Sequence, residues 1–204
     1  MNNQQKTISD WLKTGSINIF GLPFAGKDTQ GKILAEMFNG VVISGGDILR
    51  SNKDNQELQQ IMASGQIIPS DLWEQIVVPY LANSEFDNKP IILSEVGRLA
   101  GEELVVEKAT KEAGHEQKAV ILLNLSDEEV WNRFEASQKS QDRGQRADDN
   151  KAVIQTRLDS YHNLVKPVID YYRQNGSLIE IDGSLAKEEV TAAILDALEL
   201  RANN

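Results

Sequence analysis

Hydrophobic positions fall into short apolar stretches that alternate along the chain with longer segments of helical periodicity. The apolar stretches predict strands at residues 17–21, 41–44, 90–94, 118–123 and 178–181. Such alternation is typical of a parallel sheet whose crossover helices cover both faces. The pattern therefore predicts an α/β fold with a five-stranded parallel sheet and helices on both faces.

The polar and apolar positions between these strands predict the helices. Helices are expected at residues 27–38, 99–113 and 126–134, and from 148 to 175 as one helix bent at Pro167. Residues 54–83 predict an additional helical pair, inserted between the second and third strands, that could move independently. The polar stretch 136–145 lacks periodicity and predicts a mobile loop. In the N-terminal extension, residues 1–16, Ile8, Trp11 and Leu12 have helical spacing and predict a short helix packed on the core.

Composition and charge narrow the function classes. The chain has 204 residues, enough for one compact domain, and 21 basic against 31 acidic residues give a net charge of -10. This balance is opposite to that of proteins that bind nucleic-acid backbones, and it means that a nucleotide site would need locally concentrated arginines. There is no cysteine, and the two histidines are far apart in sequence, which makes a zinc site improbable. Because no apolar run is long enough for a signal peptide or a membrane span of about 18 residues, we expect a cytoplasmic protein with no membrane partner. We also expect a monomer.

The segment from residue 17 to 29 has the pattern of a phosphate-binding loop. It runs from a predicted strand into a predicted helix through G-x-x-x-x-G-K, which ends at Lys27. Backbone N–H groups at a helix N-terminus attract phosphate oxygens, and a lysine neutralises charge between the β- and γ-phosphates. An ordinary strand-turn-helix is the alternative. Asp28, followed by Thr29, stands where such loops carry serine or threonine.

Five segments resemble the adenylate kinase family, and they occur in the family's order. They are residues 21–30 (GLPFAGKDTQ), 44–50 (SGGDILR), 65–69 (GQIIP), 146–149 (RADD) with Arg157, and 181–183 (IDG). The resemblance implies a P-loop kinase fold for residues 17–204, with an acceptor-binding insertion at 45–83 and a short lid at 134–146. It also implies that the chain transfers phosphate from ATP, bound with Mg²⁺, to a nucleoside monophosphate, with ADP as the product.

The family's functional residues map onto this chain as follows. The resemblance implies that the catalytic residues are Lys27, Arg98, Arg133, Arg146 and Arg157. ATP would contact Gly21, Phe24, Ala25, Gly26, Lys27, Asp28, Thr29, Arg133 and Leu185. The acceptor would contact Gly45, Arg50, Gln66, Ile67, Ile68, Glu95, Arg98, Glu102, Arg146 and Arg157. Planar guanidinium groups bind phosphate oxygens bidentately, which is the charge stabilisation that phosphoryl transfer requires.

The chain departs from the family pattern around the expected metal. The family's Leu-Asp-Gly-Phe-Pro-Arg is Leu-Ser-Glu-Val-Gly-Arg at residues 93–98, so Ser94 replaces an aspartate. Asp47 and Glu95 are the carboxylates expected to contact Mg²⁺ through water. Phe24 and Asp28 replace glycines of the loop, and Asp28 is expected to point outward.

The sequence does not decide which base the acceptor nucleotide carries. Counting without gaps puts Glu102 where the adenylate kinases carry a glutamine that binds adenine, whereas an alignment with a deletion makes Glu102 a charge on a helix surface. Gly45 replaces the family's threonine. AMP is the favoured acceptor, and GMP, CMP and UMP are the alternatives. Two further alternatives are another small-molecule P-loop kinase and a nucleotide-binding regulatory protein with weak activity.

Overall fold

The central sheet has five parallel strands in the order β2-β3-β1-β4-β5. The computed structural model describes residues 1–52, 54–64, 68–140 and 150–204. Its strands are β1 (Ser16–Gly21), β2 (Val41–Ser44), β3 (Ile91–Ser94), β4 (Gln117–Asn124) and β5 (Leu178–Asp182). All five strands were predicted, which confirms the α/β fold. β1 lies between β3 and β4, and all six of its residues are buried.

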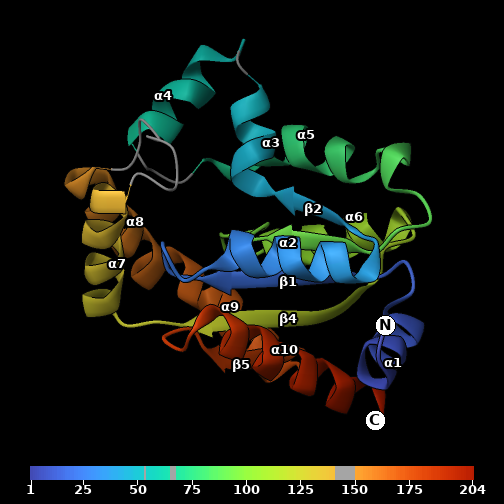
Figure 1. Ribbon diagram of the computed structural model, residues 1–204. Coiled ribbons are helices and arrows are strands. Elements are labelled where there is room, and N and C mark those ends of the chain that lie inside the picture. The colour runs from blue at the N-terminus through green and yellow to red at the C-terminus, as the bar shows by residue number, and fades with distance from the viewer. Residues whose placement is uncertain (53, 65–67, 141–149) are drawn as a thin grey trace.

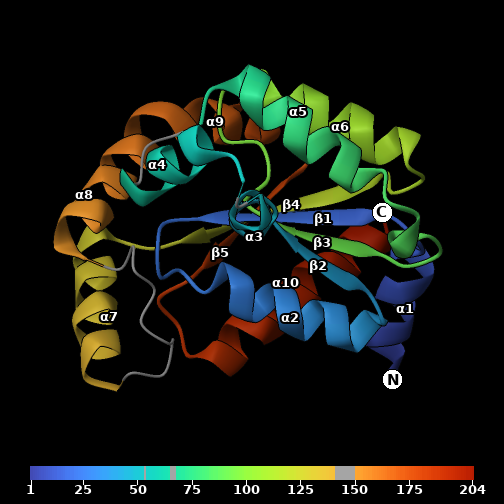
Figure 2. The same cartoon turned by 90° about the horizontal axis from the view of Figure 1, so that it is seen from above.

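Helices cover both faces of the sheet (Figure 2). On one face lie α1 (Asn3–Leu12), α2 (Lys27–Phe38) and α10 (Lys187–Ala202). On the other lie α5 (Ser70–Leu81), α6 (Glu102–Glu112) and α9 (Lys166–Gln174). Because both faces are covered, β3 and the middle of β4 are continuous apolar runs and not alternating ones.

The N-terminal helix packs on the core, as its periodicity predicted. Ile8 and Leu12 of α1 are 0% and 1% exposed and belong to the same hydrophobic cluster as Ile194 and Leu198 of α10. Gln4 also donates hydrogen bonds to carboxylates on α10. The extension is therefore an integral part of the domain.

An insertion of helices lies between β2 and β3. It comprises α3 (Gly45–Ser51), α4 (Gln56–Ser64), α5 and the 3₁₀ turn η1 (Ser84–Phe86). The predicted helical pair corresponds to α4 and α5, and Figure 1 shows α3 and α4 standing above the sheet. Ile48, Leu58 and Trp73 bury their side chains in one cluster with β3 residues, which anchors the insertion to the sheet.

Three helix boundaries differ from the expected ones. α6 begins at Glu102 and not at residue 99, and α7 (Asp127–Ser140) continues beyond residue 134 into the stretch expected to be a loop. The helix expected from 148 to 175 is α8 (Lys151–Ser160) and α9, separated by a π-helical turn at Tyr161–Val165. The interruption therefore precedes Pro167, whose ring nitrogen has no hydrogen to donate to the preceding turn. Residues 141–149 lie outside the described part of the chain.

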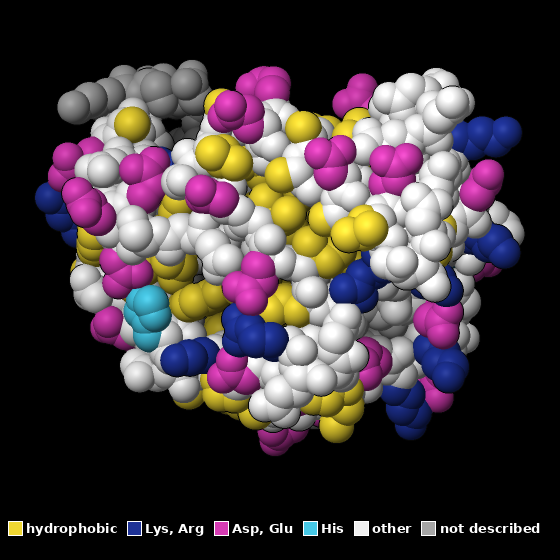
Figure 3. Space-filling model, turned by 90° about the horizontal axis from the view of Figure 1, so that it is seen from below, with side chains coloured by type: hydrophobic (Ala, Val, Ile, Leu, Met, Phe, Trp, Pro, Cys, Tyr) yellow, Lys and Arg dark blue, Asp and Glu magenta, His cyan; other side chains and the backbone are white. Residues whose placement is uncertain are grey.

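An apolar groove runs along the edge strand β5. It is lined mainly by Ile179 of β5 and by Ala197 and Leu200 of α10. Figure 3 shows the underside of the molecule, where hydrophobic side chains gather in the middle of a rim of charged ones. Among the described residues, no helix has the length and apolar character needed to cross a membrane.

Candidate active site

The phosphate-loop sequence forms a tight turn at the carboxyl end of the central strand. β1 ends at Gly21, and Gly26, at φ 93°, is the N-cap of α2. This left-handed conformation favours glycine, and it directs the first N–H groups of α2 toward the edge of the sheet. Phe24 has φ 64°, which costs a non-glycine residue about 1 kcal/mol. Its ring packs edge-on against Phe134 of α7, with the ring centroids 5.9 Å apart.

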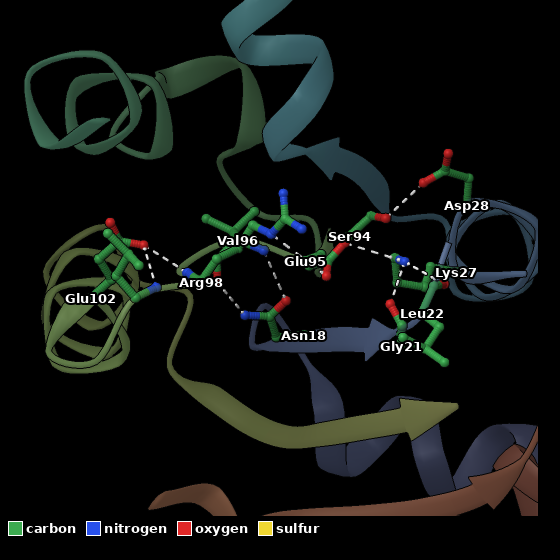
Figure 4. Close-up of polar contacts among 11 residues, drawn as sticks. Asn18, Gly21, Leu22, Lys27, Asp28, Ser94, Glu95, Val96, Arg98 and Glu102 are labelled. Atoms are coloured by element: carbon green, nitrogen blue, oxygen red, sulfur yellow. Dashed lines mark hydrogen bonds and ion pairs between the residues drawn. The ribbon is translucent and has the colours of Figure 1, made fainter. Parts of the chain in front are cut away.

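Lys27 lies over this loop. Its Nζ donates hydrogen bonds to the carbonyl oxygens of Gly21 and Leu22, at 2.6 and 3.0 Å. The same Nζ lies 3.2 Å from Glu95 Oε2 (Figure 4). The ammonium group is thus held at the mouth of the loop, where a phosphate-binding lysine is required.

Glu95 joins the two sides of the site. Its Oε1 lies 3.6 Å from Arg98 Nε, while its Oε2 faces Lys27. One carboxylate therefore lies between a cation expected to bind ATP and a cation expected to bind the acceptor phosphate. Glu95 also has φ 54°, so this arrangement is maintained in a backbone conformation that is unfavourable for a side chain larger than glycine. The expected contact of Glu95 with a metal, through water, stays a prediction.

Asp28 points toward the end of β3, which corrects the expectation that it points outward. Ser94 Oγ donates a hydrogen bond of 2.6 Å to Asp28 Oδ1. Ser94 is the last residue of β3 and is 4% exposed, so the pair spans the space between α2 and the edge of the sheet (Figure 4). The negative charge therefore lies at the mouth of the loop.

Arg133 links three elements on the ATP side. From α7, it donates hydrogen bonds to the backbone oxygens of Phe24 and Gly183, at 3.2 and 2.8 Å. It also donates to Glu129 Oε1 at 3.0 Å, and this hydrogen bond lowers the pKa of the Glu129 carboxyl. Arg133 thus connects the phosphate loop, expected to bind the ATP phosphates, to the turn after β5, expected beside the ATP base.

The comparisons with known proteins agree with this geometry. The family model described as adenylate kinase matches residues 19–177. This chain belongs to the adenylate kinase family. It is 30% identical to the adenylate kinase of Fusobacterium nucleatum, over 88% of this chain and 96% of the relative. Identity is 32% to the adenylate kinases of Nocardioides sp. (89% and 96% covered) and Phocaeicola vulgatus (90% and 98% covered).

Glu102, at the start of α6, is bound to the loop that precedes this helix. Its side chain is 3% exposed, so it is not a surface charge. Glu102 Oε2 accepts hydrogen bonds from the backbone N–H groups of Arg98 and Leu99, at 2.6 and 3.0 Å, and Oε1 accepts one of 2.9 Å from Ser70. Both oxygens accept hydrogen bonds from the protein, and the expected contact of Glu102 with the acceptor base stays a prediction. Glu102 fixes the loop that carries Arg98.

Asn18 is a site residue that the sequence analysis missed. It lies inside β1 with no exposed surface, and its Nδ2 donates a hydrogen bond of 2.8 Å to the carbonyl oxygen of Val96. Asn18 thus supports the loop after β3 from below. The available signal was a lone amide within an otherwise apolar buried strand, because such a group must have a hydrogen-bond partner.

Some of the remaining expected site residues lie in the described part of the chain, and others lie outside it. Arg157 lies on α8, whose Ile154 and Leu158 pack with Leu22 of the phosphate loop, so this helix adjoins the loop. Among the other described residues, Ala25, Gly45 and Ile68 are buried, while Thr29 and Leu185 are exposed. Outside the described residues lie Arg146, Gln66 and Ile67, and the side chains of Asp47 and Arg50.

Proposed function

We propose that this chain is an ATP-dependent kinase that transfers the γ-phosphoryl group of ATP to AMP. The observation that carries the proposal is the pair of cations at Glu95. Lys27 from the phosphate loop and Arg98 from the loop after β3 lie on opposite sides of one carboxylate. Membership of the adenylate kinase family supports the reaction type, and the similarity to adenylate kinases supports AMP as the acceptor.

Each cation then has a defined task. Phosphoryl transfer needs little covalent help from the protein and depends on positioning and on stabilising charge. Lys27 and the N-terminal N–H groups of α2 hold the ATP phosphates, and Arg133 stabilises the ATP side of the closed site. Arg146 and Arg157 stabilise the charge on the transferring group. Mg²⁺ bound with ATP neutralises part of the phosphate charge.

The acceptor is held by the helical insertion and by the loop after β3. Arg50 and Arg98 bind the phosphate of AMP, and the segment with Gln66, Ile67 and Ile68 contacts its base. Arg98 Nε supports this role, because it is buried and has no hydrogen-bond partner among the described residues. Buried donors of this kind are rare and often belong to functional sites.

A coupled assay of ADP formation tests the proposal. The purified protein is given ATP and Mg²⁺ with AMP, GMP, CMP or UMP in turn. We expect turnover with AMP at a kcat/KM at least about 100-fold above that for UMP, because mismatched buried polar groups lose hydrogen bonds. If the protein binds ATP but forms ADP with none of the four monophosphates, it is a nucleotide-binding regulatory protein and the proposal is wrong.

A further inference from the structure

We infer that Asp28 and Ser94 are the protein's ligands for the divalent cation that accompanies ATP, with carboxylate and hydroxyl in exchanged positions. This inference rests on the proposed function, since the cation arrives with the nucleotide. It assigns a metal-binding role to Asp28, which the family pattern places among loop glycines. It also assigns one to Ser94, which replaces an aspartate.

The two side chains meet at the carboxyl edge of the sheet. β1 and β3 are neighbouring parallel strands, with Ile19 paired to Ser94, so Ser94 lies beside the start of the phosphate loop. Asp28 is the second residue of α2, directly after Lys27. The Ser94 hydroxyl donates to the Asp28 carboxylate at 2.6 Å. Figure 4 shows the two side chains directed toward each other.

The pair contains the two ligand types of an ordinary P-loop metal site, but each stands at the other's position. P-loop enzymes place a hydroxyl directly after the loop lysine and an aspartate on a neighbouring strand, and both hold Mg²⁺. Here the residue after the lysine is Asp28, and the strand carries Ser94. The pair thus supplies one carboxylate and one hydroxyl, joined by a hydrogen bond. Two unrelated substitutions, each a loss of function, would have no reason to produce complementary groups at bonding distance.

The donor set fits a small hard cation. Mg²⁺ prefers oxygen ligands and is usually bound by one or two carboxylates together with substrate phosphates and water. Within the described parts of the chain, no group of three or more His, Cys, Asp or Glu residues could hold a metal. A cation held jointly by this pair and the nucleotide is therefore consistent with the protein. Glu95 is not included in this pair of ligands, because its two oxygens form ion pairs with Lys27 and Arg98.

A competing role for Asp28 predicts the opposite change in ATP affinity when its charge is removed. A carboxylate at the start of a helix interacts favourably with the helix dipole, by typically about 0.3–1 kcal/mol, but it repels nearby phosphates. If this were its whole role, removing the charge would strengthen ATP binding whether or not a divalent cation is present. A metal ligand behaves otherwise, since its removal weakens binding only when the cation is present.

The test measures Kd for ATP by calorimetry in Mg²⁺ and in EDTA, together with Mn²⁺ binding to the ATP complex by electron paramagnetic resonance. The variants are Asp28→Asn, Ser94→Ala and the double exchange Asp28→Ser with Ser94→Asp. The control is Glu36→Gln, which removes a charge from an exposed position of the same helix. Melting temperatures establish that each variant is folded.

We expect Asp28→Asn to weaken ATP binding in Mg²⁺ and Mn²⁺ binding to the complex by about 10- to 100-fold, as is typical when a metal site is damaged. Binding in EDTA should stay unchanged or become stronger. The double exchange should recover the Mg²⁺ dependence, and Glu36→Gln should change neither affinity. Tighter ATP binding by Asp28→Asn in both buffers, or a folded double exchange no better than Asp28→Asn, overturns the inference. If wild type binds no ATP in either buffer, the proposed function itself is wrong.

Discussion

The substitution Glu95→Gln tests whether the Glu95 carboxylate competes with phosphate for Lys27 and Arg98. The variant keeps the size of the side chain and the backbone conformation at φ 54° but removes the negative charge. That charge lies 3.2 Å from Lys27 Nζ and 3.6 Å from Arg98 Nε. ATP must either displace the carboxylate from Lys27 or be bound beside it.

The structure sets the size of the expected effect. The side chains of Lys27 and Glu95 are only 13% and 15% exposed, so solvent screens the pair incompletely. Two unit charges about 4 Å apart interact by about 4 kcal/mol at an effective dielectric constant near 20. Most of this is offset by desolvation and by the phosphate contacts that replace it, and we expect a net change on the order of 1 kcal/mol. Glu95→Gln should therefore bind ATP about five- to tenfold more tightly than wild type.

The assay measures the Kd for ATP of wild type and Glu95→Gln by calorimetry, first in EDTA and then with Mg²⁺. The matched control is Glu116→Gln, which removes the carboxylate of the exposed Lys118 ion pair and should leave ATP affinity unchanged. Weaker binding by Glu95→Gln in Mg²⁺, with unchanged binding in EDTA, would refute this reasoning. That result would instead support the expected role of Glu95 as a carboxylate that contacts the metal through water.

Four further substitutions test the other roles. Lys27→Ala should abolish phosphoryl transfer, because it removes a phosphate-neutralising charge, while circular dichroism shows an unchanged fold; near wild-type turnover would contradict the phosphate-loop assignment. Arg157→Ala should lower kcat by on the order of 100-fold in the coupled assay, and a change in KM alone would exclude a role in the transition state. Glu102→Ala should lower the free energy of unfolding in urea by about 2–4 kcal/mol, because it leaves buried donors unpaired. Glu102→Gln should leave the relative rates with the four monophosphates unchanged, and a shift toward AMP would place Glu102 in the base pocket.

Features that depend on neighbouring residues could be predicted from the sequence. The five strands follow from apolar runs, and the phosphate loop follows from glycines and a lysine at fixed spacing within one turn. The sequence predicts a helix from residue 99, whereas α6 begins at Glu102. In the structure Glu102 accepts the N–H groups of Arg98 and Leu99, which holds them in a loop outside the helix.

Features that depend on distant residues could not be predicted. Counting along the sequence aligns Glu102 with the family's glutamine but says nothing of its partners. Its hydrogen bond with Ser70 joins residues that are 32 positions apart. The hydrogen bond between Asp28 and Ser94 spans 66 positions, and that between Asn18 and Val96 spans 78. A sequence pattern assigns each residue a type and a place on its own element. It does not say which donor on another element that residue will meet.

The distribution of the departures bears on whether the site works. Ser94, Asp28 and Glu95 each look like a loss when the sequence is compared with the family pattern. In the structure they are not scattered: Ser94 donates to Asp28, and the next residue, Glu95, binds Lys27. Gly45, another departure, borders the same loop, since a Cβ there would lie 3.2 Å from the Glu95 carbonyl oxygen. Substitutions that accumulate without selection for catalysis leave buried polar groups without partners, which costs about 1–3 kcal/mol each. Here Ser94 and Asp28 satisfy each other and Glu95 pairs with Lys27 and Arg98, which favours a rebuilt catalytic site over a degenerate one.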